Sequence, residues 1–284
     1  MRIAITGVSG FVGQALRRFF SDRGDEVVGL SIRNITPPDE TRAKLDGCDV
    51  VINLAGANIL ARWSDAYKEQ LYESRIVTTR HLVEALSQCD ERPGVLISAS
   101  AVGIYRNGVE CDERGEQEDD FLAALCRDWE AEANEANRLG MRVALMRLGV
   151  VYGRGGGAME KMLLPFKLGV GGKLGSGTQM VSWMHVTDLI RAIAYIIDHD
   201  TLYGAFNFTA PHPLSNLEQT ELLAKALHRP AFMTVPEFAV KLLFGEGATV
   251  MLDSKEAYPK ALLDAGFEFV YPDLGSALEE IVGR

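Results

Sequence analysis

Short apolar runs alternate with longer amphipathic segments along the first half of the chain. The apolar runs are rich in β-branched residues and stop at glycine or a polar residue. They predict buried strands at 2–7, 26–33, 49–56, 94–100 and 142–151. Between them, apolar residues recur at three- and four-residue steps and predict helices at 10–24, 64–88 and 120–139. Strands that alternate with helices form βαβ units, so we expect an α/β fold with a doubly wound parallel sheet.

The pattern changes after residue 152. Residues 153–177 contain nine glycines around a helical segment, which indicates a glycine-rich, substrate-side flap with one helix in it. One more strand is expected at 204–210, followed by further helices. We therefore predict a large domain over 1–152 and a smaller, discontinuous C-terminal lobe over 153–284. The strand at 204–210 is expected to return to the large domain.

The composition limits what the chain can bind. It has 284 residues, of which 47% are hydrophobic, and a net charge of −10. Nucleic-acid binding requires a basic patch, so this charge argues against it. No segment approaches about 20 consecutive apolar residues, and the N-terminus lacks the apolar stretch of a signal peptide. We therefore expect no membrane contact. The four cysteines show no metal-ligand spacing, so we also expect reduced thiols, no metal site and a cytoplasmic protein.

The first predicted strand runs into TGVSGFVG, in which Gly7, Gly10 and Gly13 form the pattern GxxGxxG. This pattern indicates a dinucleotide site when it links a strand to a helix, as it does here. Gly7 allows a tight turn, Gly10 allows a pyrophosphate to approach, and Gly13 lets the helix pack on the strand. The amides that would face the phosphates at the helix N-terminus belong to Ser9, Gly10, Phe11 and Val12.

The end of the second strand bears on which dinucleotide is bound. An acidic residue there would hold the ribose 2′-hydroxyl of NAD, whereas an arginine can pair with the 2′-phosphate of NADP. This chain has Arg33, which favours NADP(H); the alternative is a solvated arginine at a strand end. The third strand ends in NLAG (53–56), whose small residues let the backbone pass close to the ligand.

Motifs spread over almost the whole chain resemble one protein family. TGVSGFVG, NLAG and the later SASAVGIY are similar to the extended short-chain dehydrogenases/reductases, which have a Rossmann fold and include nucleotide-sugar epimerases. INLAGANI, ESRIVTTRHLV, DWEAEA, GGGAMEKMLLPFKLGVGGKLGSG and WMHVTDL look like one atypical branch, the epimerase-family proteins or predicted nucleoside-diphosphate-sugar epimerases. The resemblance implies that residues 1–152 form an NADP-binding Rossmann domain.

Further cofactor contacts follow from this resemblance. Carried over by position, it implies NADP(H) contacts at Ile32, Arg33, Leu54, Ala55, Arg75 and Val151. The guanidinium of Arg75 is expected to reach a phosphate, although by itself it would be an ordinary surface cation of a helix. To these contacts we add Gly56 and Ser98, which lie near the ends of the third and fourth strands.

The catalytic part of the resemblance is incomplete. Active extended members use a serine or threonine after the fourth strand, a tyrosine as acid/base, and a lysine four residues later. The lysine lowers the tyrosine pKa from about 10 and holds the nicotinamide ribose. Ser100 matches the serine. In the helix FLAALCRDWEAE the tyrosine and lysine positions hold Leu125 or Cys126 and Trp129 or Glu130. Neither of these two alignments places a tyrosine and a lysine at the dyad positions. Cys126 is either a reactive thiol or a buried, inert one.

Other side chains offer acid/base chemistry near the same place. Tyr105, five residues after Ser100, is either a catalytic phenol or an aromatic wall of the pocket. His185 and Asp188 could act as acid and base. Alternatively, Asp188 or Thr187 caps the following helix and His185 is structural. We take Ser100 and Tyr105 as the catalytic candidates.

Three functions remain open from the sequence. The first is an NADP(H)-binding, epimerase-like or reductase-like protein that acts on a small polar or nucleotide-linked substrate without the standard dyad. The second is a non-catalytic NADP(H)-binding redox sensor or scaffold, and the third is a Rossmann domain for another nucleotide. The expected partner is a small molecule, with a homodimer as the candidate assembly.

Overall fold

Six parallel strands form the centre of the molecule. The computed structural model describes residues 1–31 and 38–283, so the predicted contacts at Ile32 and Arg33 lie outside the described residues. The sheet has the order β11-β6-β4-β3-β1-β2. Its strands are β1 (Arg2–Thr6), β2 (Glu26–Leu30), β3 (Val50–Asn53), β4 (Val95–Ala101), β6 (Arg142–Leu148) and β11 (Gly204–Phe208). Every pairing in this sheet is parallel, which confirms the predicted doubly wound α/β fold.

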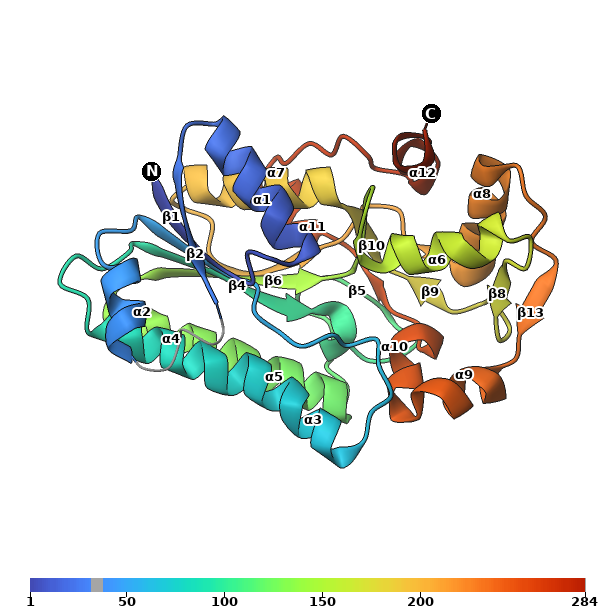
Figure 1. Cartoon of the computed structure of the whole chain (residues 1–284), viewed down its shortest axis with the longest axis horizontal. Coiled ribbons are helices and arrows are strands. Elements are labelled where there is room, and N and C mark those ends of the chain that lie inside the picture. The colour runs from blue at the N-terminus through green and yellow to red at the C-terminus, as the bar shows by residue number, and fades with distance from the viewer. Residues whose placement is uncertain (32–37, 284) are drawn as a thin grey trace.

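Helices cover both faces of the sheet, as Figure 1 shows. One layer contains α1 (Phe11–Asp22) and α7 (Val186–Asp198), and the other contains α2 (Pro38–Leu45), α4 (Thr78–Ser87) and α5 (Phe121–Asn134). Side chains of β1 alternate between these layers. Ile3 and Ile5 share a core cluster with Phe20 of α1, whereas Ala4 belongs to the cluster that contains Leu82 of α4. This period of two is what a strand covered on both faces requires.

The helix predicted at 64–88 is a composite. It consists of α3 (Asp65–Tyr72), a π-helical turn (Glu73–Val77) and α4. Ser64 caps its start by accepting a hydrogen bond from the amide of Tyr67. A π-helical turn inserts one residue and changes which side chains face inward, and such turns are frequent at functional sites. Here the turn carries Ser74 and Arg75.

The strand predicted at 142–151 is broken at Gly149. A Cβ at this position would lie 2.6 Å from the carbonyl oxygen of Ser182, so the chain segments can approach only at a glycine. After the break, β7 (Val150–Tyr152) leaves the main sheet and pairs with β10 (Trp183–His185). The chain then returns through α7 and β11, so both of these elements pack with the large domain.

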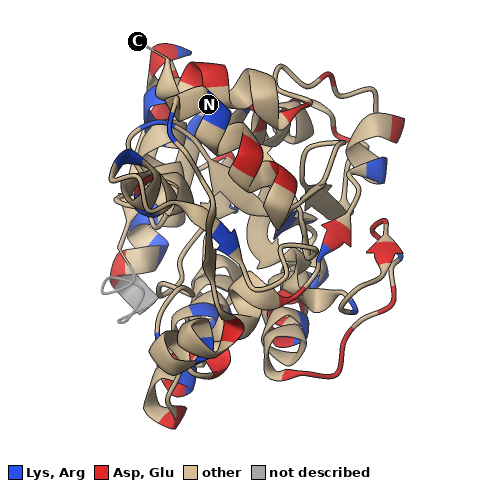
Figure 2. Cartoon of the chain, turned by 90° about the vertical axis from the view of Figure 1, so that its right-hand side faces the viewer, with Lys and Arg blue, Asp and Glu red and all other residues tan. Residues whose placement is uncertain are grey.

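Six further helices follow β7 in the chain. They are α6 (Gly157–Lys167), α8 (Asn216–Leu227), α9 (Glu237–Phe244), α10 (Thr249–Leu252), α11 (Lys260–Asp264) and α12 (Leu274–Val282), of which α11 packs against β11 of the main sheet. The short strand pairs are β5–β14 (Glu110–Cys111, Glu256–Ala257), β8–β13 (Gly172–Leu174, Met233–Val235) and β9–β12 (Met180–Val181, Leu214–Ser215). The division into a large domain and a C-terminal lobe stays a prediction. Figure 2 shows acidic and basic residues interspersed over this side of the molecule. Among the described helices, none has the length and apolar character needed to cross a membrane.

Candidate functional site

The glycine loop between β1 and α1 is closely packed. Gly7 has φ +67°, and a Cβ there would lie 3.0 Å from the carbonyl oxygen of Leu54. A Cβ at Gly13 would lie 2.3 Å from the carbonyl oxygen of Gly7. No side chain caps the N-terminus of α1 at Gly10, and its first turn contains no acidic residue. The amide of Gly10, one of the predicted phosphate donors, instead donates to the carbonyl of Gly7 at 3.0 Å. The amides of Phe11 and Val12 have no capping side chain among the described residues and can bind an anion, with the helix dipole in the favourable direction.

The loop lies at the point where the order of the sheet reverses. From β1 the chain goes first to β2 on one side and then to β3 on the other, and ligands of open α/β sheets bind beyond the strand ends at such a point. Thr6, at the end of β1, joins the glycine loop to the loop that follows β3. Its hydroxyl donates to Asn53 at 2.7 Å and accepts the amides of Leu54 and Ala55 at 2.9 and 3.0 Å.

A hollow of about 600 Å³ adjoins the glycine loop. It is lined by Val8, Ser9, Gln14, Arg17, Arg18 and Ser21. Val8 reaches the end of β2, because a Cβ at Gly29 would lie 2.9 Å from the Val8 Cγ1 atom. The hollow therefore extends from the glycine loop along the exposed face of α1 to Ser21, near the C-terminal end of the helix.

Buried polar side chains connect β3 and β4 to the helices behind them. The amide group of Asn53 donates to Thr79 at 2.9 Å and to Ser98 at 3.1 Å. Thr79 also accepts a hydrogen bond from the indole of Trp129 at 3.0 Å. The structure thus places Ser98, a predicted cofactor contact, inside a buried network below the strand ends.

Arg75 and Ser74 hold the loop that follows β3. Ser74 accepts the amide of Ala57 at 3.0 Å, and Nη2 of Arg75 donates to the carbonyl of Ala57 at 2.9 Å. The guanidinium lies directly on Gly56, where a Cβ would be 3.1 Å from Cζ. It also lies over the ring of Trp129, 5.2 Å from the centroid. Burial lowers the pKa of Arg75.

Helix α5 carries the candidate dyad positions. Its N-cap is Asp120, whose carboxylate accepts a hydrogen bond from the amide of Ala123 at 2.7 Å. Four of its side chains, which occupy the candidate dyad positions, are buried: Leu125, Cys126, Trp129 and Glu130. Burial, followed by the nearby Glu130 carboxylate, raises the pKa of Cys126 to about 12. A thiol with this pKa stays protonated at neutral pH, which fits the buried, inert alternative.

Glu130 is the centre of a buried ion pair. Arg147 donates to both of its carboxylate oxygens, from Nε at 2.8 Å and from Nη2 at 2.9 Å. The hydroxyl of Ser100 donates to the same carboxylate at 2.6 Å. The bidentate geometry and the third donor stabilise the charges in a place with little solvent. A structural ion pair therefore lies where the family resemblance expects a catalytic dyad.

Tyr105 belongs to the same network. Its hydroxyl donates to Asn207 at 2.6 Å and accepts from Nη1 of Arg147 at 2.9 Å. Burial raises the pKa of Tyr105 further above its ordinary value, despite the adjacent cation. The side chain of Asn207 continues the network by donating to the carbonyl of Tyr258 at 2.8 Å, in the C-terminal lobe.

His185 and Asp188 both have structural partners. His185 caps α7 itself, because its Nδ1 accepts the amide of Thr187 at 3.2 Å while Nε2 lies 3.1 Å from Glu280. The expected cap at Asp188 or Thr187 is therefore wrong. Asp188 lies within the first helical turn, and its carboxylate accepts the amides of residues 270 and 271, each at 2.8 Å.

The glycine-rich segment after β7 packs against the side chain of Phe11. A Cβ at Gly153, Gly156 or Gly157 would lie 2.9, 2.4 or 3.0 Å, respectively, from an atom of the Phe11 ring. Val151, another predicted contact, is half-buried in β7 beside this segment. The sequence identified Phe11 for its amide only, so this role of its ring was missed. Only the folded chain brings residues 11 and 153–157 together.

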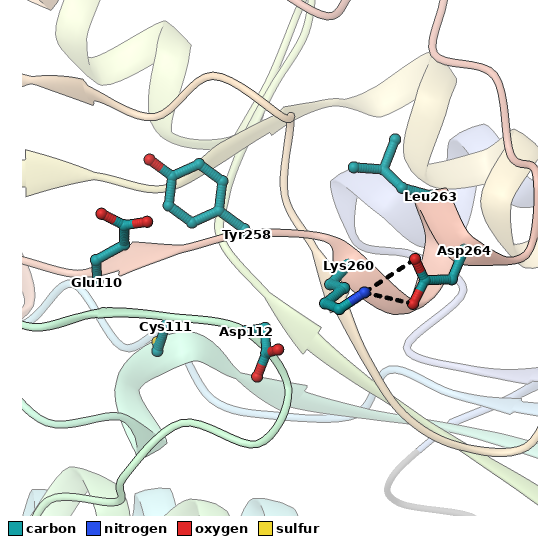
Figure 3. Close-up of a pocket in the computed structure, with 7 residues that line it drawn as sticks. All are labelled: Glu110, Cys111, Asp112, Tyr258, Lys260, Leu263 and Asp264. Atoms are coloured by element: carbon teal, nitrogen blue, oxygen red, sulfur yellow. Dashed lines mark hydrogen bonds and ion pairs between the residues drawn. The ribbon is translucent and has the colours of Figure 1, made fainter.

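A separate hollow lies at the β5–β14 pair (Figure 3). It is lined by Glu110, Cys111, Asp112, Tyr258, Lys260, Leu263 and Asp264. Lys260 is paired with Asp264 at 2.7 Å, and burial raises the pKa of Cys111 to about 11. Within the described residues, no group of three or more His, Cys, Asp and Glu side chains could hold a metal ion.

Comparisons with known proteins agree with this geometry. The model of the NAD dependent epimerase/dehydratase family matches residues 3–208, and that of a domain of unknown function (DUF1731) matches residues 235–281. The epimerase family protein SDR39U1 of Homo sapiens is 36% identical, with 99% of this chain and 100% of that protein covered. The epimerase family protein YfhF of Bacillus subtilis is 34% identical, with 99% and 98% covered.

Solved structures give the same result. Human SDR39U1 (isoform2), crystallised with NADPH, is 34% identical with a TM-score of 0.92, and 99% of each chain is covered. The UDP-glucose 4-epimerase of Thermus thermophilus, in complex with NAD, has a TM-score of 0.78 at 17% identity over 99% and 98% of the chains, a likeness of fold. The predicted resemblance to the epimerase-family proteins is confirmed. This chain belongs to the NAD dependent epimerase/dehydratase family.

Proposed function

We propose that the chain binds NADP(H) across the carboxyl edge of its sheet. The observation that carries this proposal is the uncapped N-terminus of α1 beside a glycine loop that leaves no room for side chains at Gly7 and Gly13. The pyrophosphate would lie on the amides of Phe11 and Val12 at the start of α1, and the adenosine beyond the carboxyl end of β2. The NADPH in the crystals of the human relative supports NADP(H) as the cofactor.

Selection for the 2′-phosphate is assigned to Arg33, with Ile32 beside it. The nicotinamide half would pass Leu54, Ala55 and Gly56 and reach Val151, the contacts that the sequence resemblance implies. When bound, the cofactor supplies a hydride donor or acceptor. The glycine-rich segment 153–177 and the C-terminal lobe would then enclose a small polar or nucleotide-linked substrate.

We propose Ser100 as the group that meets the substrate. Its own hydrogen is donated to Glu130, so its oxygen can make a further hydrogen bond only as an acceptor. In an alcohol oxidation, the oxidised cofactor would supply the acceptor for the hydride of the alcohol carbon, and the substrate hydroxyl would give its proton to Ser100 while Ser100 gives its own to the Glu130 carboxylate. Tyr105 already has a donor and an acceptor as partners, and we assign it to positioning Arg147.

The second candidate is a non-catalytic NADP(H)-binding sensor or scaffold. It is favoured by the burial of Ser100, which is 1% exposed, and of all four side chains at the candidate dyad positions, because a group without access to substrate cannot transfer a proton to it. The free cysteines fit a cytoplasmic protein for either function. The homodimer remains a prediction, which sedimentation analysis of the purified chain would test.

Binding and turnover measurements separate these functions. Titration with NADPH and NADH, followed by nicotinamide fluorescence, should show tighter binding of NADPH, and Arg33→Ala should reduce the ratio of the two Kd values. Turnover is then followed at the nicotinamide absorbance with alcohols, carbonyl compounds and nucleoside-diphosphate sugars. Activity that is lost in Ser100→Ala with an unchanged Kd supports the enzyme. Tight binding without turnover supports the sensor, and no binding of either nucleotide contradicts both.

A further inference from the structure

We infer that one end of the molecule binds the surface of an anionic lipid bilayer through an apolar patch with a basic rim. The patch consists of five exposed side chains: Leu164 of α6, Leu168 and Val170 just after this helix, and Phe232 and Met233 where β13 begins. Leu168 is 69% exposed and Phe232 is 77% exposed. Soluble monomers rarely expose large apolar side chains as a group, and such a group marks an interaction surface.

The five side chains come from two segments that the fold brings together. Val170 folds back on the last turn of α6, where its amide donates to the carbonyl of Pro165 at 3.0 Å. Two residues later β8 begins, and its Gly172 pairs with Met233 of β13. A Cβ on Gly172 would lie 2.0 Å from the carbonyl oxygen of Met233, so the two segments are in direct contact. The start of β13, with Phe232, therefore lies close to the segment that carries Val170.

The core below the patch is already filled. Phe166 of α6 is buried in the same core cluster as residues of α8 and α12, and a Cβ on Gly171 would lie 2.5 Å from its ring. Residues two positions apart lie on different sides of a helix, whereas residues four positions apart share one side. Leu164 and Leu168 therefore lie together on the side that faces away from Phe166. They are available to a partner outside the chain.

The segments around the patch are basic, although the protein is acidic. The whole chain has 29 lysines and arginines and 39 aspartates and glutamates. Residues 154–187 contain four of these basic residues and one acidic residue, Glu160, and residues 222–236 contain two basic residues and no acidic one. Lys161, Lys167 and Arg229 are exposed, and none of them forms an ion pair with a described residue. Each lies within one helical turn or three residues of an apolar member of the patch.

The size and charge of this surface select its partner. A stable protein interface buries about 800 Å² and roughly 20–30 residues on each side, far more than five apolar side chains and their rim. A second copy that docked patch to patch would also bring two sets of unpaired cations together. An anionic bilayer has neither difficulty. Apolar side chains enter the boundary between headgroups and acyl chains, while lysines and arginines stay at the phosphates.

A flat surface can reach the patch. Figure 1 shows the end of α6, β8 and β13 at one end of the long axis of the molecule. β13 leads into α9, which is also apolar on its outer side: Phe238 and Leu242 are exposed one turn apart, whereas Val240 between them is buried. The expectation of no membrane contact rested on continuous apolar segments, whereas this surface combines segments about 60 residues apart.

Cosedimentation with vesicles tests the inference. The full chain should sediment with vesicles of equal parts phosphatidylglycerol and phosphatidylcholine, and much less with phosphatidylcholine alone, because the cations gain only from anionic headgroups. Added salt should weaken the binding. Phe232→Ser together with Leu168→Ser should reduce the partition coefficient at least about tenfold. Tyr203→Ser, which changes an exposed ring next to β11, should leave it unchanged.

Two charge variants separate the basic rim from the net charge of the protein. Lys167→Gln with Arg229→Gln should weaken binding to the anionic vesicles roughly ten- to thirtyfold, since each cation near such a surface contributes about a fivefold factor. Arg18→Gln with Arg114→Gln removes the same charge from exposed positions elsewhere and should have little effect. Circular dichroism shows whether each variant is folded. If the double serine variant does not fold, the comparison of the two charge variants decides.

Three results would overturn the inference. The first is a wild-type chain that does not sediment with the anionic vesicles, and the second is equal binding by wild type and the folded patch and rim variants. The third is binding that soluble glycerol 3-phosphate abolishes, which would assign the cations to a free phosphate ligand. If wild type ignores vesicles but forms a dimer in sedimentation-velocity runs, and Phe232→Ser dissociates that dimer, the patch is instead an interface between copies.

Discussion

Ser100 donates its hydroxyl hydrogen to the Glu130 carboxylate across 2.6 Å. In active extended members of the family, the serine at this position contacts the substrate oxygen. Glu130 is one of the two residues of this chain that align with their catalytic lysine. The contact places a carboxylate, itself paired with Arg147, beside the serine instead of the expected lysine. A serine next to a carboxylate is oriented to accept a proton from an alcohol, whereas a serine next to a lysine and tyrosine is oriented to donate to a carbonyl.

The Glu130–Arg147 ion pair should contribute strongly to the stability of the fold. Glu130→Gln removes one charge and leaves the Arg147 guanidinium buried without a counter-ion, so we expect a loss of about 3–5 kcal/mol in the free energy of unfolding. Urea titration followed by circular dichroism measures this loss. Glu132→Gln, which breaks the exposed pair with Arg80 two residues further along α5, is the matched control and should cost less than about 1 kcal/mol. Equal losses in the two variants would show that the buried ion pair contributes no more to the free energy of unfolding than the exposed one.

The glycine loop should tolerate no side chain at Gly13. A methyl group there would meet the carbonyl oxygen of Gly7 at 2.3 Å, which would push the loop away from α1 and move the amides that bind the pyrophosphate. We expect Gly13→Ala to weaken NADPH binding at least about tenfold, since misplaced amides lose more than one charged hydrogen bond. Gly94→Ala is a suitable comparison, because nothing lies within 4 Å of its Cβ position. Unchanged NADPH binding in Gly13→Ala would exclude this loop as the phosphate site.

His185 should make the stability of the protein sensitive to acid. Burial lowers its pKa in the folded state, although the facing carboxylates of Glu280 and Asp188 oppose the shift. The unfolded chain therefore binds the proton more readily, so the stabilisation is present above about pH 6.5 and is lost as the pH falls below it. Thermal unfolding at pH 7.5 and 5.5 measures the effect, which His185→Gln should reduce. His212→Gln, at an exposed histidine, should keep the wild-type difference.

The Phe11 ring should couple the cofactor loop to the glycine-rich segment. Phe11→Ala leaves a gap between the loop and residues 153–157, so we expect faster amide hydrogen exchange in that segment and weaker NADPH binding. Phe238→Ala changes a ring that is 72% exposed on α9 and should alter neither property. Exchange in 153–157 that stays at the wild-type rate in Phe11→Ala would argue against the coupling.

Features that depend on local chain geometry could be predicted from the sequence. The glycine loop is one, because the turn, the phosphate amides and the helix start lie within a few consecutive residues. The parallel sheet is another, since each buried strand is itself a continuous apolar run. The shortest strands were missed, because pairs of two or three residues have too few positions to show a periodic pattern.

The interior of the candidate site depends on contacts that a single sequence does not display. Glu130 and Arg147 are 17 residues apart, on a helix and a strand, and nothing in either segment indicates that they meet. The π-helical turn that positions Arg75 has ordinary helix-forming residues. His185 was assigned no cap because histidine is an uncommon capping residue, and its role depends on the extended backbone just before α7.

The contact between Phe11 and the glycines at 153, 156 and 157 also limits how the two halves of the protein can be exchanged. The ring belongs to the Rossmann half. It fits against the other half only because residues 153, 156 and 157 have no side chains. A chimera that joins this Rossmann half to the C-terminal lobe of a relative will assemble well only if the incoming lobe has the same empty positions. Residue 11 and these glycines therefore have to be exchanged together, although they lie far apart in the chain.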